Sequence, residues 1–184
     1  MEAVGCAGVD WIQIREKDLS GCELVRLASE AVRRVPGGCR ILVNDRMDVA
    51  RAAGAHGAHL GEQSLPVEEA KRLSKERNFA RQFLIGASTH DVAAAVAAEQ
   101  HGADYVVFGP VFETPSKIAF GPAQGIERLA EACSSVSIPV IAIGGVTLQN
   151  ARECAAAGAA GIAAIRLFQD AADVAAIVRQ LRRG

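Results

Sequence analysis

A recurring phrase constrains the fold of this 184-residue chain more than any other feature of its sequence. In "AAGAHGAHL", "EQHGADYVVF" and "AAAGAAGIAAI", the expected end of a helix is followed by a glycine, a short turn and a run of apolar residues. A glycine just past a helix commonly adopts a left-handed cap, and an apolar run without alternation is typical of a parallel strand covered on both faces. Three copies of this phrase predict a repeating unit of helix, turn and buried strand.

Apolar runs alternate with amphipathic stretches along the whole sequence. We expect strands at residues 11–15, 40–44, 57–61, 83–87, 105–109, 140–144 and 161–165. We expect helices at residues 22–35, 46–53, 66–77, 91–101, 124–134, 148–157 and 171–183. Strands that alternate with helices predict a parallel sheet, either closed into a barrel or open and doubly wound.

Polar and glycine residues follow every expected strand, and this distribution favours the barrel. Barrel active sites form at the carboxyl ends of all the strands, whereas an open sheet concentrates its site at one switch point. We therefore predict an α/β fold, a single TIM (β/α)8-type barrel domain over residues 1–184. Only seven strands are visible, so we expect the first strand to be missing. Either the chain is N-terminally truncated, which we favour, or another segment fills the gap.

The charge and cysteine content exclude several classes of function. The formal net charge is −1, so no global basic field favours nucleic acid or an anionic membrane, and any anion must be bound by local groups. The five cysteines show no CxxC or Cys/His spacing of a zinc site. We see no signal peptide and no apolar run of the ~18 residues that a membrane helix requires, so we expect a cytoplasmic protein. Unpaired edges of a seven-stranded sheet would favour a homo-oligomer.

Two motifs in the first half carry candidate ligand groups. In "QIREKD", Gln13, Arg15 and Lys17 alternate through the end of a strand and so share one face, where they could cradle a diphosphate and a polar ring, or simply be solvated. In "VNDR", Asn44 and Asp45 could hold a ligand amine and Mg²⁺, which favours carboxylate oxygens. Asp45 could instead be the N-cap of the next helix.

Two further motifs follow the middle strands. In "GASTHD", Ser88 could bind substrate or cap a helix, and His90 could transfer protons near neutral pH or lie at the surface start of the helix. In "GPVFETPSK", Thr114, Ser116 and Lys117 offer two hydroxyls and a cation, which could clamp a phosphate or a diphosphate, or form only a rigid turn. His59, inside a strand, is expected to be a packed core residue.

The "AIGGV" motif places Gly144 and Gly145 between a strand and a helix that Thr147 is expected to open. Backbone N–H groups there can approach a phosphate closely, with help from the helix N-terminus. Together with the last strand and its "IRLF" segment, which includes Arg166, this matches the phosphate site common after the last two strands of barrels.

These phrases, in this order, resemble the thiamine phosphate synthase family over nearly the whole chain. The phrases that carry the likeness are "QIREKD", "VNDR", "GAHLGEQSLP", "IGASTH", "ADYVVFGPVFETPSK" and "IPVIAIGGVT". The resemblance implies a (β/α)8 barrel and a transferase of thiamine biosynthesis. That enzyme joins hydroxymethylpyrimidine diphosphate to a thiazole phosphate and releases diphosphate.

The resemblance also implies roles for the candidate residues. The pyrimidine diphosphate would be held by Gln13, Arg15, Lys17 and Asn44, and Mg²⁺ by Asp45. The departing diphosphate would contact Ser88 and Lys117. The thiazole phosphate would be held by Thr114, Ser116 and the backbone at Gly145.

Two positions depart from the family pattern. Ser64 in "GEQS" stands where the family has a second carboxylate for Mg²⁺, and Arg166 stands where the family usually has a small residue beside the phosphate. A related branch, the thiazole tautomerases, catalyses metal-independent proton shifts, and His90 lies where the proton-transferring histidine of that branch would fall. We expect the synthase activity, with the tautomerase or a non-catalytic phosphate-binding homologue as alternatives.

Overall fold

The computed structural model describes residues 2–75, 83–114 and 122–183. The chain divides into two compact units, Met1–Gly86 and Ala87–Gly184, and strand β4 (Leu84–Thr89) contains the boundary between them. Each unit repeats the pattern of a parallel strand followed by a helix.

The first unit contains three strands in parallel register and the first residues of β4. Its elements are α1 (Glu2–Cys6), β1 (Trp11–Ile14), α2 (Gly21–Arg34), β2 (Arg40–Asn44), α3 (Met47–Ala52), β3 (Gly57–Leu60) and α4 (Val67–Ser74). Strand β2 pairs with β1 on one side and with β3 on the other. The backbone N–H of Leu84 donates to the carbonyl of His56, so β4 starts beside β3.

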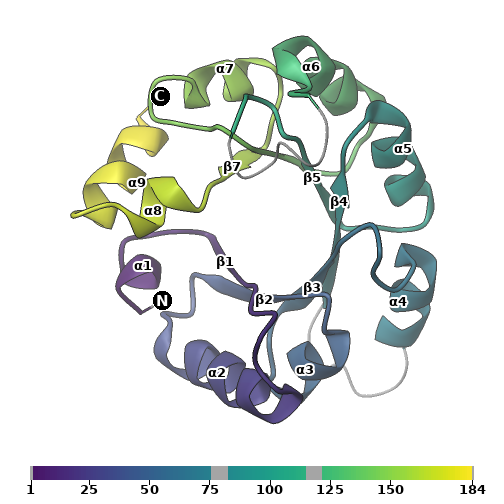
Figure 1. Ribbon diagram of the computed structural model, residues 1–184, viewed down its shortest axis with the longest axis vertical. Helices are drawn as coiled ribbons and strands as arrows, with labels where there is room; N and C mark the ends of the chain where they lie inside the picture. Colours follow the sequence, from purple (N-terminus) through teal and green to yellow (C-terminus); the bar gives the residue numbers. More distant parts are fainter. Residues whose placement is uncertain (1, 76–82, 115–121, 184) are drawn as a thin grey trace. The chain divides into compact units, whose positions relative to one another are not determined.

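Helix α2 illustrates how the sequence positions these elements. Ser20 caps its N-terminus in a reciprocal pair with Glu23, and each side chain accepts from the backbone N–H of the other residue. Leu24, Ala28 and Ala31 are spaced along one face of the helix, and all three are buried. Helix α2 packs against β2 (Figure 1), and this buried face belongs to a core that includes the fully buried Ile41 and Val43.

The second unit continues the same arrangement. Its elements after β4 are α5 (Val92–Gln100), β5 (Tyr105–Phe108), α6 (Gly125–Ser135), β6 (Val140–Ile143), α7 (Ala151–Ala156), β7 (Gly161–Ala163), α8 (Arg166–Gln169) and α9 (Val174–Arg182). Strands β5, β6 and β7 pair in parallel, and α5, α6 and α7 pack on them in turn (Figure 1). The Glu99 side chain, at the end of α5, accepts hydrogen bonds from the backbone N–H groups of Ser137 and Ile138 just before β6.

The seven strands and seven helices expected from the sequence are confirmed, with ends shifted by up to three residues. Helix α8 covers the "RLFQ" segment, where the sequence pattern predicts no helix. Helix α4 begins at Val67, one residue later than expected, and Pro66 is its N-cap. His59 is 3% exposed, as expected of a core residue. None of the helices that the described ranges contain combines the length and the apolar character needed to cross a membrane.

Candidate active site

The ends of β1 and β2 bring three of the predicted residues into contact. Gln13 Nε2 donates to Asn44 Oδ1 at 2.7 Å, and Asn44 Nδ2 donates to Asp45 Oδ2 at 2.6 Å. The register of the two parallel strands places Gln13 opposite Leu42, two residues before Asn44. The three side chains therefore form one hydrogen-bonded chain that ends in a carboxylate.

The loop after β3 holds the other oxygen of that carboxylate. Asp45 Oδ1 accepts from the backbone N–H of Gly61 at 3.2 Å and from the hydroxyl of Ser64. Gly61 N–H also donates to Ser64 Oγ at 2.7 Å, so the two groups of the loop that bond to the carboxylate are also bonded to each other. Asp45 itself has a φ of 60°, a left-handed conformation that Asp tolerates better than most residues.

The helix-capping alternative for Asp45 is wrong. Helix α3 begins at Met47, and its N-cap is Arg46, which makes no side-chain capping bond. The left-handed turn at Asp45 directs its carboxylate to Gly61 and Ser64 instead of to the first amides of the helix.

The prediction that Gln13, Arg15 and Lys17 share one face of a strand is wrong, because only Gln13 lies in the strand. Strand β1 ends at Ile14, so Arg15 and Lys17 lie in the following loop, where both are exposed. Side-chain alternation is a property of extended, paired backbone and ends with the strand. The two cations are therefore placed by the loop and not by the strand.

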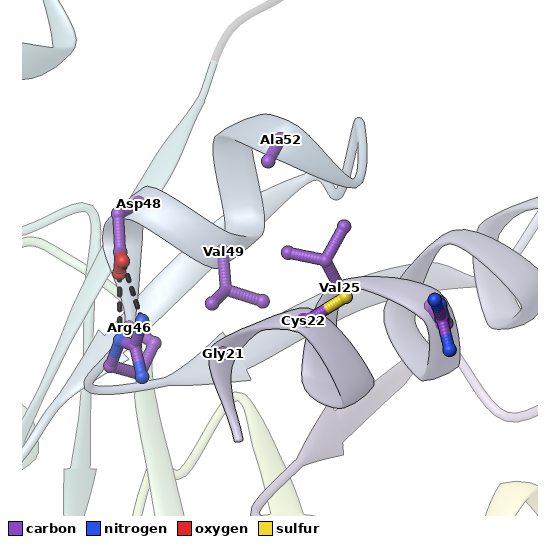
Figure 2. Close-up of a pocket in the computed structure, with 8 residues that line it drawn as sticks. Gly21, Cys22, Val25, Arg46, Asp48, Val49 and Ala52 are labelled. Carbon is purple, nitrogen blue, oxygen red and sulfur yellow. Dashed lines mark hydrogen bonds and ion pairs between the residues drawn. The ribbon is translucent and has the colours of Figure 1, made fainter. Parts of the chain in front are cut away.

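The first unit contains two surface hollows near the ends of its strands. A groove of about 320 Å³ lies between α2 and α3, and Figure 2 shows Arg46 and Asp48 facing each other at one end of it. Its lining is Gly21, Cys22, Val25, Arg26, Arg46, Asp48, Val49 and Ala52, none of them a predicted site residue. The Arg46 side chain donates to Asp48 at 2.6 Å and 2.9 Å, and these bonds hold the pKa of Asp48 below its ordinary value.

The second hollow, of about 310 Å³, has Asp45 in its wall together with Met47, Arg51 and Leu65. It is thus the one of the two that adjoins a predicted ligand group. Within the described ranges, no group of three or more His, Cys, Asp or Glu side chains is arranged to hold a metal ion.

In the second unit, the segment after β6 is built on two glycines with left-handed backbone, Gly144 with a φ of 95° and Gly145 with a φ of 65°. A Cβ at Gly145 would lie 2.7 Å from the Glu113 carbonyl oxygen, and one at Gly144 would lie 2.5 Å from Pro110. Only glycine fits both the conformation and the space. The segment after β5 therefore packs directly on the bare backbone of the glycine pair.

Thr147 does not open a helix, contrary to the sequence prediction. Helix α7 begins at Ala151, and Asn150 is its N-cap. Thr147 N–H donates to Asn150 Oδ1 at 2.7 Å, and Asn150 N–H donates to Thr147 Oγ1 at 3.4 Å, which fixes a turn in place of the expected first helical turn. The glycine pair is thus followed by a turn, and a helix N-terminus does not directly follow it.

The other predicted residues of the second unit lie at or beyond strand ends. Ser88 is half-buried near the end of β4, and Thr114 is half-buried in the segment that follows β5. His90 Nδ1 is hydrogen-bonded to the carbonyl oxygen of Gly109. Arg166 is exposed at the start of α8. Ser116 and Lys117 lie outside the described residues.

Three residues that were not predicted as site residues also contribute hydrogen bonds to these sites. Gly61 and Ser64 hold Asp45, and Asn150 holds the glycine segment through a hydrogen bond from Nδ2 to the Gly145 carbonyl at 3.0 Å. The spacing of Thr147 and Asn150 is a sequence signal for the reciprocal turn. Ser64 is 19 positions from Asp45, and no local pattern marks that contact.

The repeated βα units and the polar strand ends define an α/β protein of the TIM-barrel class. The solved structure of thiamine phosphate pyrophosphorylase from Pyrococcus furiosus matches 99% of this chain with a TM-score of 0.86 and 36% identity, and the match covers 85% of that chain. The fold class predicted from the sequence is thereby confirmed.

The chain belongs to the thiamine monophosphate synthase family, whose model matches residues 1–168. It is 47% identical to the thiamine-phosphate synthase of Methanoculleus marisnigri, over 95% of this chain and 81% of that protein. It is 46% identical to a putative thiamine-phosphate synthase of Geobacter sulfurreducens, over 90% of this chain and 76% of that protein.

Proposed function

We propose that this protein makes thiamine phosphate from hydroxymethylpyrimidine diphosphate and thiazole phosphate, with release of diphosphate. The observation that carries the proposal is its 47% identity to a thiamine-phosphate synthase over 81% of that enzyme's length. The hydrogen-bonded chain from Gln13 to Asp45 supports it, because a heterocycle with polar substituents needs such fixed amide groups. The cytoplasmic location expected from the sequence forms part of the proposal.

The proposed roles distribute the ligand groups between the two units. In the first unit, Gln13 and Asn44 would contact the pyrimidine, and the exposed cations Arg15 and Lys17 would contact its diphosphate. In the second unit, the backbone amides of the glycine pair would bind the thiazole phosphate, as open backbone N–H groups do. The remaining proposed contacts to phosphoryl groups are Ser88, Thr114, Ser116, Lys117 and Arg166.

Asp45 suits a magnesium ion. Its carboxylate accepts three hydrogen bonds, from Asn44, Gly61 and Ser64. A carboxylate has about four lone-pair sites, so one remains for a cation. Mg²⁺ is commonly bound by one or two protein carboxylates, with water and substrate phosphates as its other ligands. A single held carboxylate therefore fits, and Ser64 would leave the ion with one carboxylate fewer than the family pattern.

In the proposed reaction, the bond between the pyrimidine methylene carbon and the diphosphate oxygen breaks, and both electrons leave with the oxygen. The thiazole nitrogen then donates its lone pair to that carbon and forms the new C–N bond. Mg²⁺ would supply positive charge against the departing diphosphate. Arg15, Lys17 and Lys117 would stabilise the same developing charge, and Gln13 and Asn44 would hold the ring in place for the attack.

A second candidate function is the metal-independent tautomerisation of thiazole phosphate. The observation that favours it is the contact between His90 Nδ1 and the Gly109 carbonyl. A carbonyl oxygen only accepts, so Nδ1 carries the proton, and in neutral imidazole Nε2 is then the basic nitrogen. A histidine fixed in this tautomer is suited to move a proton.

A two-substrate assay with and without Mg²⁺ separates these functions. A synthase forms thiamine phosphate from both substrates and loses that activity in EDTA. A tautomerase acts on thiazole phosphate in EDTA and loses its activity in His90→Ala. Saturable binding of thiazole phosphate with no turnover in either assay would identify a non-catalytic homologue and contradict both proposals.

Lys117→Ala tests the proposed diphosphate contact. We expect the substitution to weaken diphosphate binding and to lower kcat by about 10²-fold, the size of effect seen when one group that stabilises transition-state charge is removed. The fold should be unchanged by circular dichroism. Lys75→Ala, at the exposed C-terminal end of α4, is the control and should keep full activity. An unchanged dissociation constant for diphosphate in Lys117→Ala would refute the role.

A further inference from the structure

We propose that Asp45, through Asn44, sets the orientation of the Gln13 amide and thereby makes the site select a hydrogen-bond donor on the heterocycle it binds. The proposal rests on the proposed function for the identity of the heterocycle. It assigns to Asp45 a role in ligand selection that is separate from any role in holding a metal ion. The evidence is the direction of each hydrogen bond in the chain.

The direction starts at the carboxylate, because an ionised carboxylate accepts hydrogen bonds and cannot donate them. Asn44 lies 2.6 Å from Asp45 Oδ2 and must turn its NH2 group toward it. The side-chain oxygen of Asn44, Oδ1, then faces Gln13. Gln13 must therefore donate to it from Nε2, and the two atoms lie 2.7 Å apart. The carboxylate thus fixes the Asn44 amide, and the Asn44 amide fixes that of Gln13. The orientation of Gln13 is therefore set by Asp45, which lies two hydrogen bonds away.

This orientation determines what Gln13 offers to a ligand. Its Nε2 faces Asn44, so the side-chain oxygen of Gln13 points away from Asn44, at the exposed end of β1. An oxygen acceptor pairs with a ring amino group and is repelled by a ring carbonyl. Hydroxymethylpyrimidine carries such an amino group. The site would therefore prefer it to an analogue in which that amino group is replaced by a carbonyl.

Because the loop after β3 donates hydrogen bonds to residue 45, the single substitution Asp45→Asn should reverse the orientation of the Gln13 amide. In Asp45→Asn, the new amide faces the backbone N–H of Gly61, which now lies 3.2 Å from Asp45 Oδ1 and can only donate. The Ser64 hydroxyl donates to the same oxygen, and these two donors keep the amide oxygen at that end, so the new NH2 group faces Asn44. Asn44 would then turn its oxygen toward residue 45 and its NH2 group toward Gln13. Gln13 would turn in response and present its own NH2 group to the ligand.

The test compares the binding of two uncharged ligands, hydroxymethylpyrimidine and its carbonyl analogue, to the full chain in EDTA. Isothermal titration calorimetry gives the ratio of their dissociation constants. We expect the unmodified protein to prefer the amino compound by about tenfold, the effect of one well-formed hydrogen bond. We expect Asp45→Asn to prefer the carbonyl compound. Because metal is absent and neither ligand carries phosphate, a change in metal or diphosphate binding cannot produce this reversal.

Two further variants show whether the effect passes through the chain. Asp48→Asn, whose carboxylate pairs with Arg46 and not with Asn44, is the matched control and should keep the original preference. Asn44→Leu removes the middle amide, so the preference should become the same whether residue 45 is Asp or Asn. Circular dichroism and thermal unfolding would verify that each variant is folded.

A folded Asp45→Asn variant that keeps the preference for the amino compound would overturn the proposal. So would a reversal that persists in the Asn44→Leu background. The two-substrate assay is separate, since it tests product formation by the unmodified protein. If thiamine phosphate forms and the preference does not reverse, the orientation proposal fails and the proposed function stands. If the preference reverses and no product forms, the proposed function fails instead.

Discussion

The two units of the chain build their strand ends in different ways. In the first unit, side chains from three strand ends bond to one another, and the Asp45 carboxylate accepts from three donors. In the second unit, the segment after β6 relies on glycines without side chains, held by Asn150 and packed beneath Phe112 and Glu113. Side chains can select a ligand by the direction of their hydrogen bonds, whereas a bare backbone accepts any anion that fits. These two constructions suit the ring site and the phosphate site that we propose for the two units.

The largest effect is expected at Gly145, where backbone conformation and space both demand glycine. Gly145→Ala should lower the free energy of unfolding by about 2–5 kcal/mol, because the new Cβ overpacks the Glu113 backbone and the left-handed conformation is strained. Urea unfolding measures the change. It should also abolish binding of thiazole phosphate.

Gly54→Ala is the matched control for that prediction. Gly54 has a similar φ of 68°, but a Cβ there meets no atom within 4 Å. We expect it to cost only the conformational strain, about 1–2 kcal/mol. Equal losses in the two variants would show that packing around Gly145 contributes nothing.

The next effect is expected at Ser64, where the first unit depends on a hydroxyl. Ser64→Ala should lower the free energy of unfolding by about 1 kcal/mol, since it removes hydrogen bonds with Asp45 and Gly61 at a half-buried position. A stability equal to that of the unmodified protein would indicate that Gly61 alone holds the carboxylate.

A substitution at Thr89 should raise the free energy of unfolding, in contrast to the substitutions above. Its side chain is 2% exposed, and its hydroxyl has no hydrogen-bond partner among the residues that the structure describes. Thr89→Val keeps the shape and removes the unsatisfied group, so it should raise the free energy of unfolding by about 1 kcal/mol. Thr147→Val, which loses the bond from Asn150 N–H, should instead be destabilising and serves as the comparison.

The smallest effect concerns acid stability. Hydrogen bonds from Ser137, helped by one from Ile138, hold the pKa of Glu99 below its ordinary value of 4.5. A lowered pKa in the folded state gives stability that is present above the ordinary pKa and is lost as the pH falls through the lowered one. Glu99→Gln should therefore be less stable than the unmodified protein at pH 7, and the difference should shrink as the pH falls below 4.5. Thermal unfolding at a series of pH values would reveal it, and a difference that does not depend on pH would contradict it.

Much of the fold could be predicted because its signals are local. The glycines after helix ends and the apolar runs each depend on neighbouring residues only. The order of the motifs also sufficed for the family, which the comparisons confirm. The predictions failed at the boundaries of regular elements, after β1 at Arg15 and before α7 at Thr147, since periodicity says nothing about the backbone outside the regular residues.

The sequence by itself determined the repeating βα pattern, the polar strand ends and the family of this protein. Only the tertiary structure decided that Asp45 faces Ser64 and Gly61 rather than its own helix, and that Gln13 and Asn44 form a directed chain. The physical reason is that periodicity depends on the few residues of one element. The direction of a hydrogen bond depends instead on which donors and acceptors the fold brings within 3 Å, and these come from segments far apart in the chain.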